Sequence, residues 1–122
     1  MAAILFVRIK SNLSGEEFER RLAERRPLFR EVPGLVQKVY GRDRETGDVC
    51  GIYFFESEDA LAEFRETELA RTIPTAYEAV DFRREAYEVL YPLWPERGPF
   101  TVEHTAAAAR LEMWPDSIAS AG

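Results

Sequence analysis

The chain has 122 residues with a formal net charge of −6, and 31% of its residues are charged. This length fits one domain, and the acidic balance argues against sequence-independent nucleic-acid binding, which depends on basic stripes that neutralise phosphate. No apolar run approaches the roughly 18 residues of a membrane helix, and the N-terminus lacks the pattern of a signal peptide, so we expect no membrane association and a cytoplasmic protein.

The N-terminal segment predicts a strand followed by a helix. Ala3 to Ile9 is almost wholly apolar, and Ser14-Gly15-Glu16-Glu17 matches a capping box, with Ser at the cap and Glu three residues on. Pro27 lies inside the predicted helix, where a proline costs about 3 kcal/mol. We therefore expect a kink there, or a break after which Pro27 opens a second short helix, before Pro33-Gly34 ends the segment.

One face of this helix is predicted to be apolar and the others charged. The apolar face carries Phe18, Leu22 and Phe29. Arg20-Arg21 and Arg25-Arg26 alternate with glutamates at helical spacing, which is typical of a solvated face with i,i+4 ion pairs.

The next segment predicts a hairpin and a second helix. Leu35 to Tyr40 and Val49 to Phe55 are rich in β-formers, and Glu45-Thr46-Gly47-Asp48 between them supplies the Gly that a tight turn needs. Ser57 can cap a helix whose first turn carries two carboxylates. A last strand is expected at about Glu85 to Leu93.

The resulting order β-α-β-β-α-β is the ferredoxin-like plait, an α+β fold with an antiparallel sheet. We expect this domain to span residues 1–94. We expect residues 95–122 to be a C-terminal extension, partly helical or disordered, in which Ala106 to Leu111 could form one or two helical turns and Ser117 to Gly122 is frayed.

The strands also predict self-association. Ile4 to Val7, Gly51 to Phe55 and Tyr87 to Leu93 carry bulky apolar residues on both parities, so both faces of the sheet should be covered. Two helices cover only one face, and a large exposed apolar patch is unusual in a soluble monomer. A homodimer through the sheet faces follows.

Residues 32–64 carry a family resemblance, in the run VPGLVQKVYGRDRETGDVCGIYFFESEDALAEF. This run resembles the monooxygenase family of the dimeric α+β barrel superfamily, which is related to the antibiotic-biosynthesis and quinol monooxygenases. The similar features are the Pro-Gly-Leu entry to a strand, the Lys and the aromatic residue within that strand, and the Gly-Ile-Tyr strand before the second helix. The resemblance covers about Ala3 to Leu93. It implies a dimeric α+β barrel, catalysis without a cofactor, and a pocket in each subunit between helices and sheet, open at one end.

The residue inventory argues against a metal site. One histidine, His104, and one cysteine, Cys50, cannot form a His/Cys cluster, and no Gly-rich phosphate loop is present, so no metal or other cofactor is expected. Haem-degrading relatives would place a histidine on the second helix, and Leu61 to Ile73 has none. Cys50 is predicted to be a small buried hydrophobe. His104 either packs within the tail or, if the tail folds over the pocket mouth, serves as base or hydrogen-bond partner.

The remaining candidates are mainly aromatic. A hairpin that turns on Thr46-Gly47 places Tyr40 opposite Tyr53 and Lys38 opposite Phe55, and a bulge at Gly47 would shift this register by one. If that face is the helix-covered one, these four residues line the pocket, with Gly51 leaving space for a ligand beside Tyr53. The predicted catalytic residues are Tyr53 and Tyr40, and the predicted substrate-binding residues are Lys38, Phe55, Phe64, Tyr87, Trp94 and His104.

The same side chains have a simpler interpretation as core or dimer-interface aromatics, whose hydroxyl groups bond to backbone or water. Arg65 and Arg71 on the second helix are either solvated or reach an anionic substrate.

The predicted function is cofactor-independent oxygenation of a small aromatic or polyketide-like molecule. A deprotonated phenol or anthrone can pass an electron to O₂ itself, so the pocket needs to orient the substrate, exclude water and stabilise the anion. The alternatives are a cyclase or isomerase that polarises a carbonyl with the same groups, and a non-catalytic small-molecule binding protein.

Overall fold

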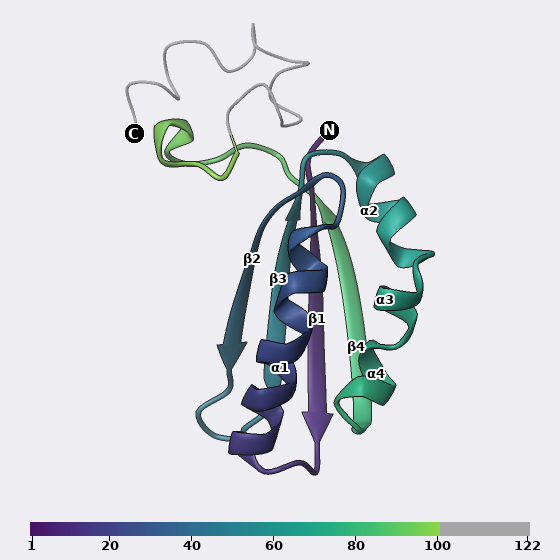
Figure 1. Cartoon of the computed structure of the whole chain (residues 1–122). Coiled ribbons are helices and arrows are strands. Elements are labelled where there is room, and N and C mark those ends of the chain that lie inside the picture. Colours follow the sequence, from purple (N-terminus) through teal and green to yellow (C-terminus); the bar gives the residue numbers. More distant parts are fainter. Residues whose placement is uncertain (101–122) are drawn as a thin grey trace, which may run out of the picture.

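A computed structural model describes residues 1–100 of the chain as one antiparallel sheet with helices on one face (Figure 1). The strands are β1 (Ala3–Ser11), β2 (Leu35–Arg42), β3 (Val49–Phe55) and β4 (Ala79–Glu88), in the spatial order β2-β3-β1-β4. The helices are α1 (Gly15–Arg30), α2 (Glu58–Arg65), α3 (Glu68–Arg71) and α4 (Ile73–Ala76). This is the predicted ferredoxin-like α+β fold.

The pairing register divides each central strand between two faces. Ala3, Leu5 and Val7 of β1 lie opposite Phe55, Tyr53 and Gly51 of β3, and all six are buried under the helices. The alternate residues point to the other side of the sheet, which we call the open face. Its apolar residues are half-buried or exposed, and they are Ile4, Phe6, Val39, Cys50, Ile52, Phe54 and Tyr87. Cys50, predicted to be buried, is therefore only half-buried.

The helix α1 begins as predicted but does not break. The Ser14 side chain accepts a hydrogen bond from the Glu17 amide, and one continuous helix runs to Arg30 with Pro27 inside it. Proline has no backbone N–H, so Pro27 cannot donate a hydrogen bond to the Ala23 carbonyl. Both residues lie on the exposed side of the helix. Water can satisfy that carbonyl, and the helix is continuous, so the expected break at Pro27 is wrong.

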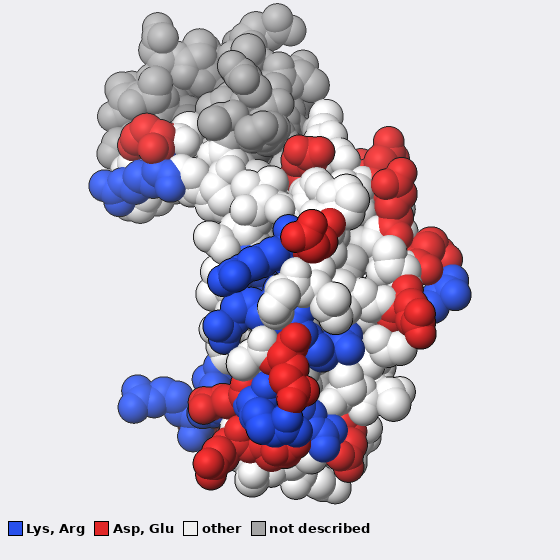
Figure 2. Space-filling view, in the orientation of Figure 1, with Lys and Arg blue, Asp and Glu red and all other residues white. Residues whose placement is uncertain are grey.

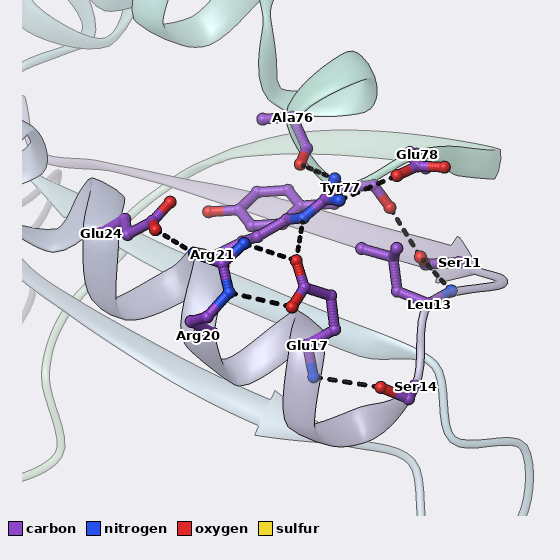
Figure 3. Close-up of polar contacts among 10 residues, drawn as sticks. All are labelled: Ser11, Leu13, Ser14, Glu17, Arg20, Arg21, Glu24, Ala76, Tyr77 and Glu78. Atoms are coloured by element: carbon purple, nitrogen blue, oxygen red, sulfur yellow. Dashed lines mark hydrogen bonds and ion pairs between the residues drawn. The ribbon is translucent and has the colours of Figure 1, made fainter.

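Ion pairs connect α1 to the segment between α4 and β4. Figure 2 shows acidic and basic side chains mixed over the N-terminal end of α1. Arg20 and Arg21 both pair with Glu17, and Arg21 also pairs with Glu78 at 2.9 Å and donates to the Ala76 carbonyl (Figure 3). The predicted i,i+4 pairs are present, but the face is not simply solvated, because half-buried Arg25 donates to the Leu69 carbonyl at 2.9 Å.

The second helical segment is divided into three short helices by two threonines. Glu66 ends α2, and Thr67, which follows it, caps α3 by accepting a hydrogen bond from the Ala70 amide. Thr72 ends α3, and Pro74 stands at the start of α4, where its missing amide costs nothing.

The last strand was predicted too late in the chain. β4 pairs with β1 from Ala79 to Glu88, whereas the prediction was Glu85 to Leu93. Charged residues such as Asp81, Arg83 and Arg84 obscure the strand in the sequence, because an edge strand tolerates charge on both faces.

Beyond β4 the described chain packs against one end of the open face. Val89, Ala2 and Phe100 form a small buried cluster, and the Phe100 ring meets Phe54 edge to face at 5.6 Å. A 3₁₀ turn spans Pro95–Arg97. The helix predicted at 106–111 and the frayed end lie outside the described residues. Within residues 1–100, no helix is long and apolar enough to cross a membrane.

Candidate functional site

A groove of about 370 Å³ lies between the C-terminal half of α1 and strand β2. This volume is within the range of small-molecule sites, about 300 to 1,000 Å³. Its lining combines cationic, aromatic and aliphatic side chains: Arg26, Phe29, Arg30, Leu35, Val36, Gln37, Lys38 and Tyr40.

Lys38 is the chemically distinctive residue of the groove. Its Nζ lies 3.4 Å from the centre of the Phe29 ring and 4.4 Å from the centres of the Tyr40 and Tyr53 rings. Burial, followed by the positive charge of Arg25, lowers the pKa of Lys38 from 10.5 to about 7. Near neutral pH this side chain is therefore partly a free amine, which can accept a proton.

The strand register that builds this cluster differs from the prediction. Lys38 pairs with Tyr53 and Tyr40 with Gly51, two residues away from the predicted pairing of Tyr40 with Tyr53 and Lys38 with Phe55. A longer turn causes the shift, since the Asp43 and Gly47 amides donate to the Asp48 and Asp43 carbonyls, respectively. The irregularity lies between Leu35 and Gln37, not at Gly47. A shift of two preserves the face, so the predicted residues still share one side of the sheet.

The space beside Gly51 is occupied by the chain itself. A methyl group at Gly51 would lie 3.1 Å from Tyr53 Cε1 and 3.3 Å from Lys38 Cε. The glycine thus admits the Tyr53 ring and the Lys38 stem, and the expectation that it leaves room for a ligand is wrong.

A second, smaller cavity adjoins the groove. Lys38 and Tyr40 line both spaces, and Tyr53 and Tyr77 line only the cavity. Its volume of about 10 Å³ is room for about one water molecule. The Lys38 and Tyr40 side chains therefore lie where the two spaces meet.

Two polar groups near this cavity were not selected from the sequence. The Tyr77 hydroxyl and Arg25 Nε are buried and have no hydrogen-bond partner within residues 1–100. The Arg25 guanidinium lies over the Tyr77 ring at 5.6 Å, and Phe18 stacks on the same ring at 4.8 Å. A tyrosine just before a strand gives no sequence signal for this role, because its partners come from α1.

Three predicted site residues form the aromatic core beneath the groove. Tyr53, Phe55 and Phe64 are at most 2% exposed, with ring centres 5.5 to 6.3 Å apart. Burial raises the pKa of Tyr53 strongly and that of Tyr40 more modestly. Both phenols therefore stay protonated at neutral pH and can donate hydrogen bonds.

The other predicted site residues are not brought to the groove. Tyr87 lies on the open face, 53% exposed, with its hydroxyl donating to Glu85. Trp94 is 39% exposed beyond β4 and stacks with Arg97. His104 lies outside the described residues.

The two arginines considered for an anionic substrate lie elsewhere. Arg65 and Arg71 line a surface depression with Arg84, away from the groove, and Arg71 pairs with Glu66.

The protein belongs to the ferredoxin-like α+β class, because it has a four-stranded antiparallel sheet with helices on one face. A family model described as "Putative mono-oxygenase ydhR" matches residues 4–93. The chain belongs to this family, whose general kind is monooxygenase. The comparison with curated proteins finds no match.

Solved structures share the fold. SnoaB from Streptomyces nogalater, described as a cofactor-independent oxygenase, is 18% identical with a TM-score of 0.63, over 75% of this chain and 96% of SnoaB. A putative antibiotic biosynthesis monooxygenase from Deinococcus radiodurans is 12% identical with a TM-score of 0.61, and the match covers 75% of this chain and 95% of that protein. A dimeric ferredoxin-like protein of unknown function from Jannaschia sp. CCS1 is 16% identical with a TM-score of 0.58, and the match covers 73% of this chain and 100% of that protein.

Proposed function

We propose that this protein is a cofactor-independent monooxygenase that acts on a small aromatic or polyketide-like substrate bound in the α1–β2 groove. The observation that carries the proposal is Lys38, an amine with a pKa of about 7 surrounded by three aromatic rings in a groove of ligand size. A perturbed amine in a cleft is a candidate catalytic group.

The reaction needs a base, an oriented substrate and O₂. The Lys38 amine takes a proton from an anthrone-type CH₂ or a phenol, and the ammonium formed stabilises the resulting anion. The anion passes an electron to O₂, and the two radicals combine at carbon. Loss of water converts the CH₂ to C=O, so one oxygen atom enters the product, the other leaves as water, and O₂ is the only oxidant.

The neighbouring phenols stabilise charge on the substrate. Tyr40 lines the groove beside Lys38 and remains protonated, so it can donate to a developing oxyanion. Tyr53 is buried and lines the adjoining cavity instead of the groove, so it is the inner of the two phenols beside Lys38. Phe29 supplies an apolar surface for a flat ring, and Phe55 and Phe64 support Tyr53 from behind.

The comparisons support this assignment at the level of general kind. The chain belongs to a monooxygenase family, and SnoaB, which shares its fold, is described as working without a cofactor. The groove residues themselves are the basis for the substrate and for the roles of Lys38, Tyr40 and Tyr53.

The active form is proposed to be a homodimer through the open face. Phe6, Ile52 and Val39 lie side by side across three strands, and Val39 is 46% exposed in the single chain. Covering this face removes apolar surface from water. Two solved structures with the same fold, from Jannaschia and Thermobifida fusca, are described as dimeric.

The test is oxygen uptake with 1,8-dihydroxyanthrone, using protein treated with chelator and verified free of flavin. The proposal predicts enzyme-dependent consumption of one O₂ for each 1,8-dihydroxyanthraquinone formed, above the rate without protein. Turnover of an aromatic or polyketide-like substrate under anaerobic conditions would point to a cyclase or isomerase. Binding without any turnover would point to a binding protein.

A further inference from the structure

The groove is basic although the protein as a whole is acidic. Arg26, Arg30 and Lys38 line it, and no Asp or Glu does. Figure 2 shows Lys and Arg side chains gathered on the β2 side of the C-terminal half of α1. In a protein with a net charge of −6, two arginines and a partly protonated lysine at one groove create a local field that favours an anionic ligand.

The arginines at the groove differ from the other arginines of α1. Arg20 and Arg21 pair with Glu17, and Arg25 donates to a backbone carbonyl. Arg26 and Arg30 make no ion pair or side-chain hydrogen bond within residues 1–100, and both are exposed. Their i,i+4 spacing places them one helical turn apart on the same face.

The helix dipole does not account for this pair. A cation in the last turn of a helix is favourable, which is sufficient reason for Arg30. Arg26 lies a turn earlier, where the effect has fallen off. Both charges are also close enough to the Tyr40 hydroxyl to favour its ionised form.

We infer that Arg26 and Arg30 form a subsite for a carboxylate carried by the aromatic substrate. The ring lies over Phe29, Lys38 and Tyr40, and the carboxylate lies at the rim between the two guanidinium groups, which match a carboxylate through paired N–H donors. The inference rests on the proposed function for the aromatic class of the ligand, and it adds the anionic group that the substrate carries.

The test is binding, measured without turnover. Rhein, which is 4,5-dihydroxyanthraquinone-2-carboxylic acid, and its carboxamide have the same ring system and differ in one charged group. Fluorescence or calorimetric titration of the wild-type protein at low salt should give at least tenfold tighter binding of rhein than of the amide. The preference should decrease as salt is added, because the subsite is exposed.

Variants separate the subsite from general electrostatics. Arg26→Gln/Arg30→Gln should bring the rhein-to-amide ratio close to one, mainly by weakening the binding of rhein. Arg44→Gln/Arg65→Gln removes the same charge outside the groove and should keep the wild-type ratio.

Equal affinity for the two compounds, absence of measurable binding of either, or an equal loss in both double variants would overturn the inference. Because no step depends on O₂, a protein that discriminates between the compounds but does not oxidise an anthrone would contradict the proposed reaction alone.

Discussion

At the residue scale, the unusual chemistry of Lys38 comes from side chains on three different elements. Phe29 belongs to α1, Tyr40 to β2 and Tyr53 to β3, and all three rings contact the same ammonium. A desolvated amine favours its neutral form. Lys38 therefore combines two properties that a catalytic base needs, a pKa near the operating pH and a position facing the groove.

The first prediction is that Lys38 makes stability depend on pH in the alkaline range. Between pH 7 and 10.5 the unfolded chain holds a proton that the folded chain releases, so the free energy of unfolding rises with pH there. The contribution is at most about 1.4 kcal/mol per pH unit. Lys38→Met should lose this rise in urea titrations across the range, and Lys10→Met, at an exposed lysine, should keep it. The same slope in wild type and Lys38→Met would contradict the prediction.

The second prediction concerns the hydroxyl of Tyr53, a residue of the buried core that lines the small cavity adjoining the groove. Tyr53→Phe should change the free energy of unfolding by no more than about 1 to 1.5 kcal/mol. It should weaken ligand binding or lower turnover tenfold or more, on the order of 1.4 kcal/mol. Tyr87→Phe removes a hydroxyl on the open face and is the matched control. It should leave ligand binding and turnover unchanged.

A large stability loss in Tyr53→Phe with function intact would make Tyr53 a purely structural residue. The buried, unpartnered hydroxyl of Tyr77 would then be the next candidate.

The sequence predicts the face of the site residues but not their contacts. Alternation along two strands is enough to place Lys38, Tyr40 and Tyr53 on one side of the sheet, and this holds even though the register differs by two. The pKa of Lys38 depends on how α1 crosses β2. That crossing is a tertiary property, and so is the position of the Arg25 guanidinium over the Tyr77 ring.

At the element scale, local signals identify α1 and the two hairpin strands well, but they identify the hairpin register and β4 poorly. Caps and turns are short-range features, and Ser14, Ser57 and Gly47 all lie where the sequence places them. β4 can be identified from its pairing with β1 but not from alternation of apolar and polar residues, because an edge strand needs no apolar pattern. α1 continues through Pro27, so the cost of an interior proline, about 3 kcal/mol, is outweighed by the rest of the helix and its packing.

A third prediction follows from the ion pairs that Glu17 makes with Arg20 and Arg21 within α1. Hydrogen bonds from Arg20 and then Arg21 lower the pKa of Glu17 to about 2, so its contribution to stability is present above pH 4.5 and is lost as pH falls toward 2. Glu17→Gln should lower Tm at pH 7 and reduce the further loss of Tm between pH 4.5 and 2. Glu16→Gln, in the same first turn, is the control. Equal effects of the two substitutions would show that the pairs do not stabilise α1.

At the scale of the whole molecule, the sheet has one face under helices and one apolar face that the single chain leaves half-exposed. The sequence indicates this through strands that are apolar on both parities. It does not indicate that residues 89–100 return to one end of the open face, because that contact joins Phe100 to Phe54 across the chain.

The fourth prediction is that the protein is a dimer at micromolar concentration by light scattering. Ile52→Glu places a charge at the centre of the open face and should give a folded monomer. Leu28→Glu introduces the same charge at an exposed apolar residue of α1 and should remain dimeric. A wild-type monomer, or an Ile52→Glu dimer as stable as the wild type, would contradict the proposed interface.

The central claim is that Lys38 acts as the base of a cofactor-free oxygenation, and the pH dependence of oxygen uptake tests it most directly. Initial rates with 1,8-dihydroxyanthrone, corrected for the rate without protein, should rise with pH in the wild type with an apparent pKa near 7. Lys38→Met should be at least tenfold slower, on the order of 1.4 kcal/mol in the barrier, and should lack this titration. A folded Lys38→Met protein with the rate and pH profile of the wild type would contradict the account.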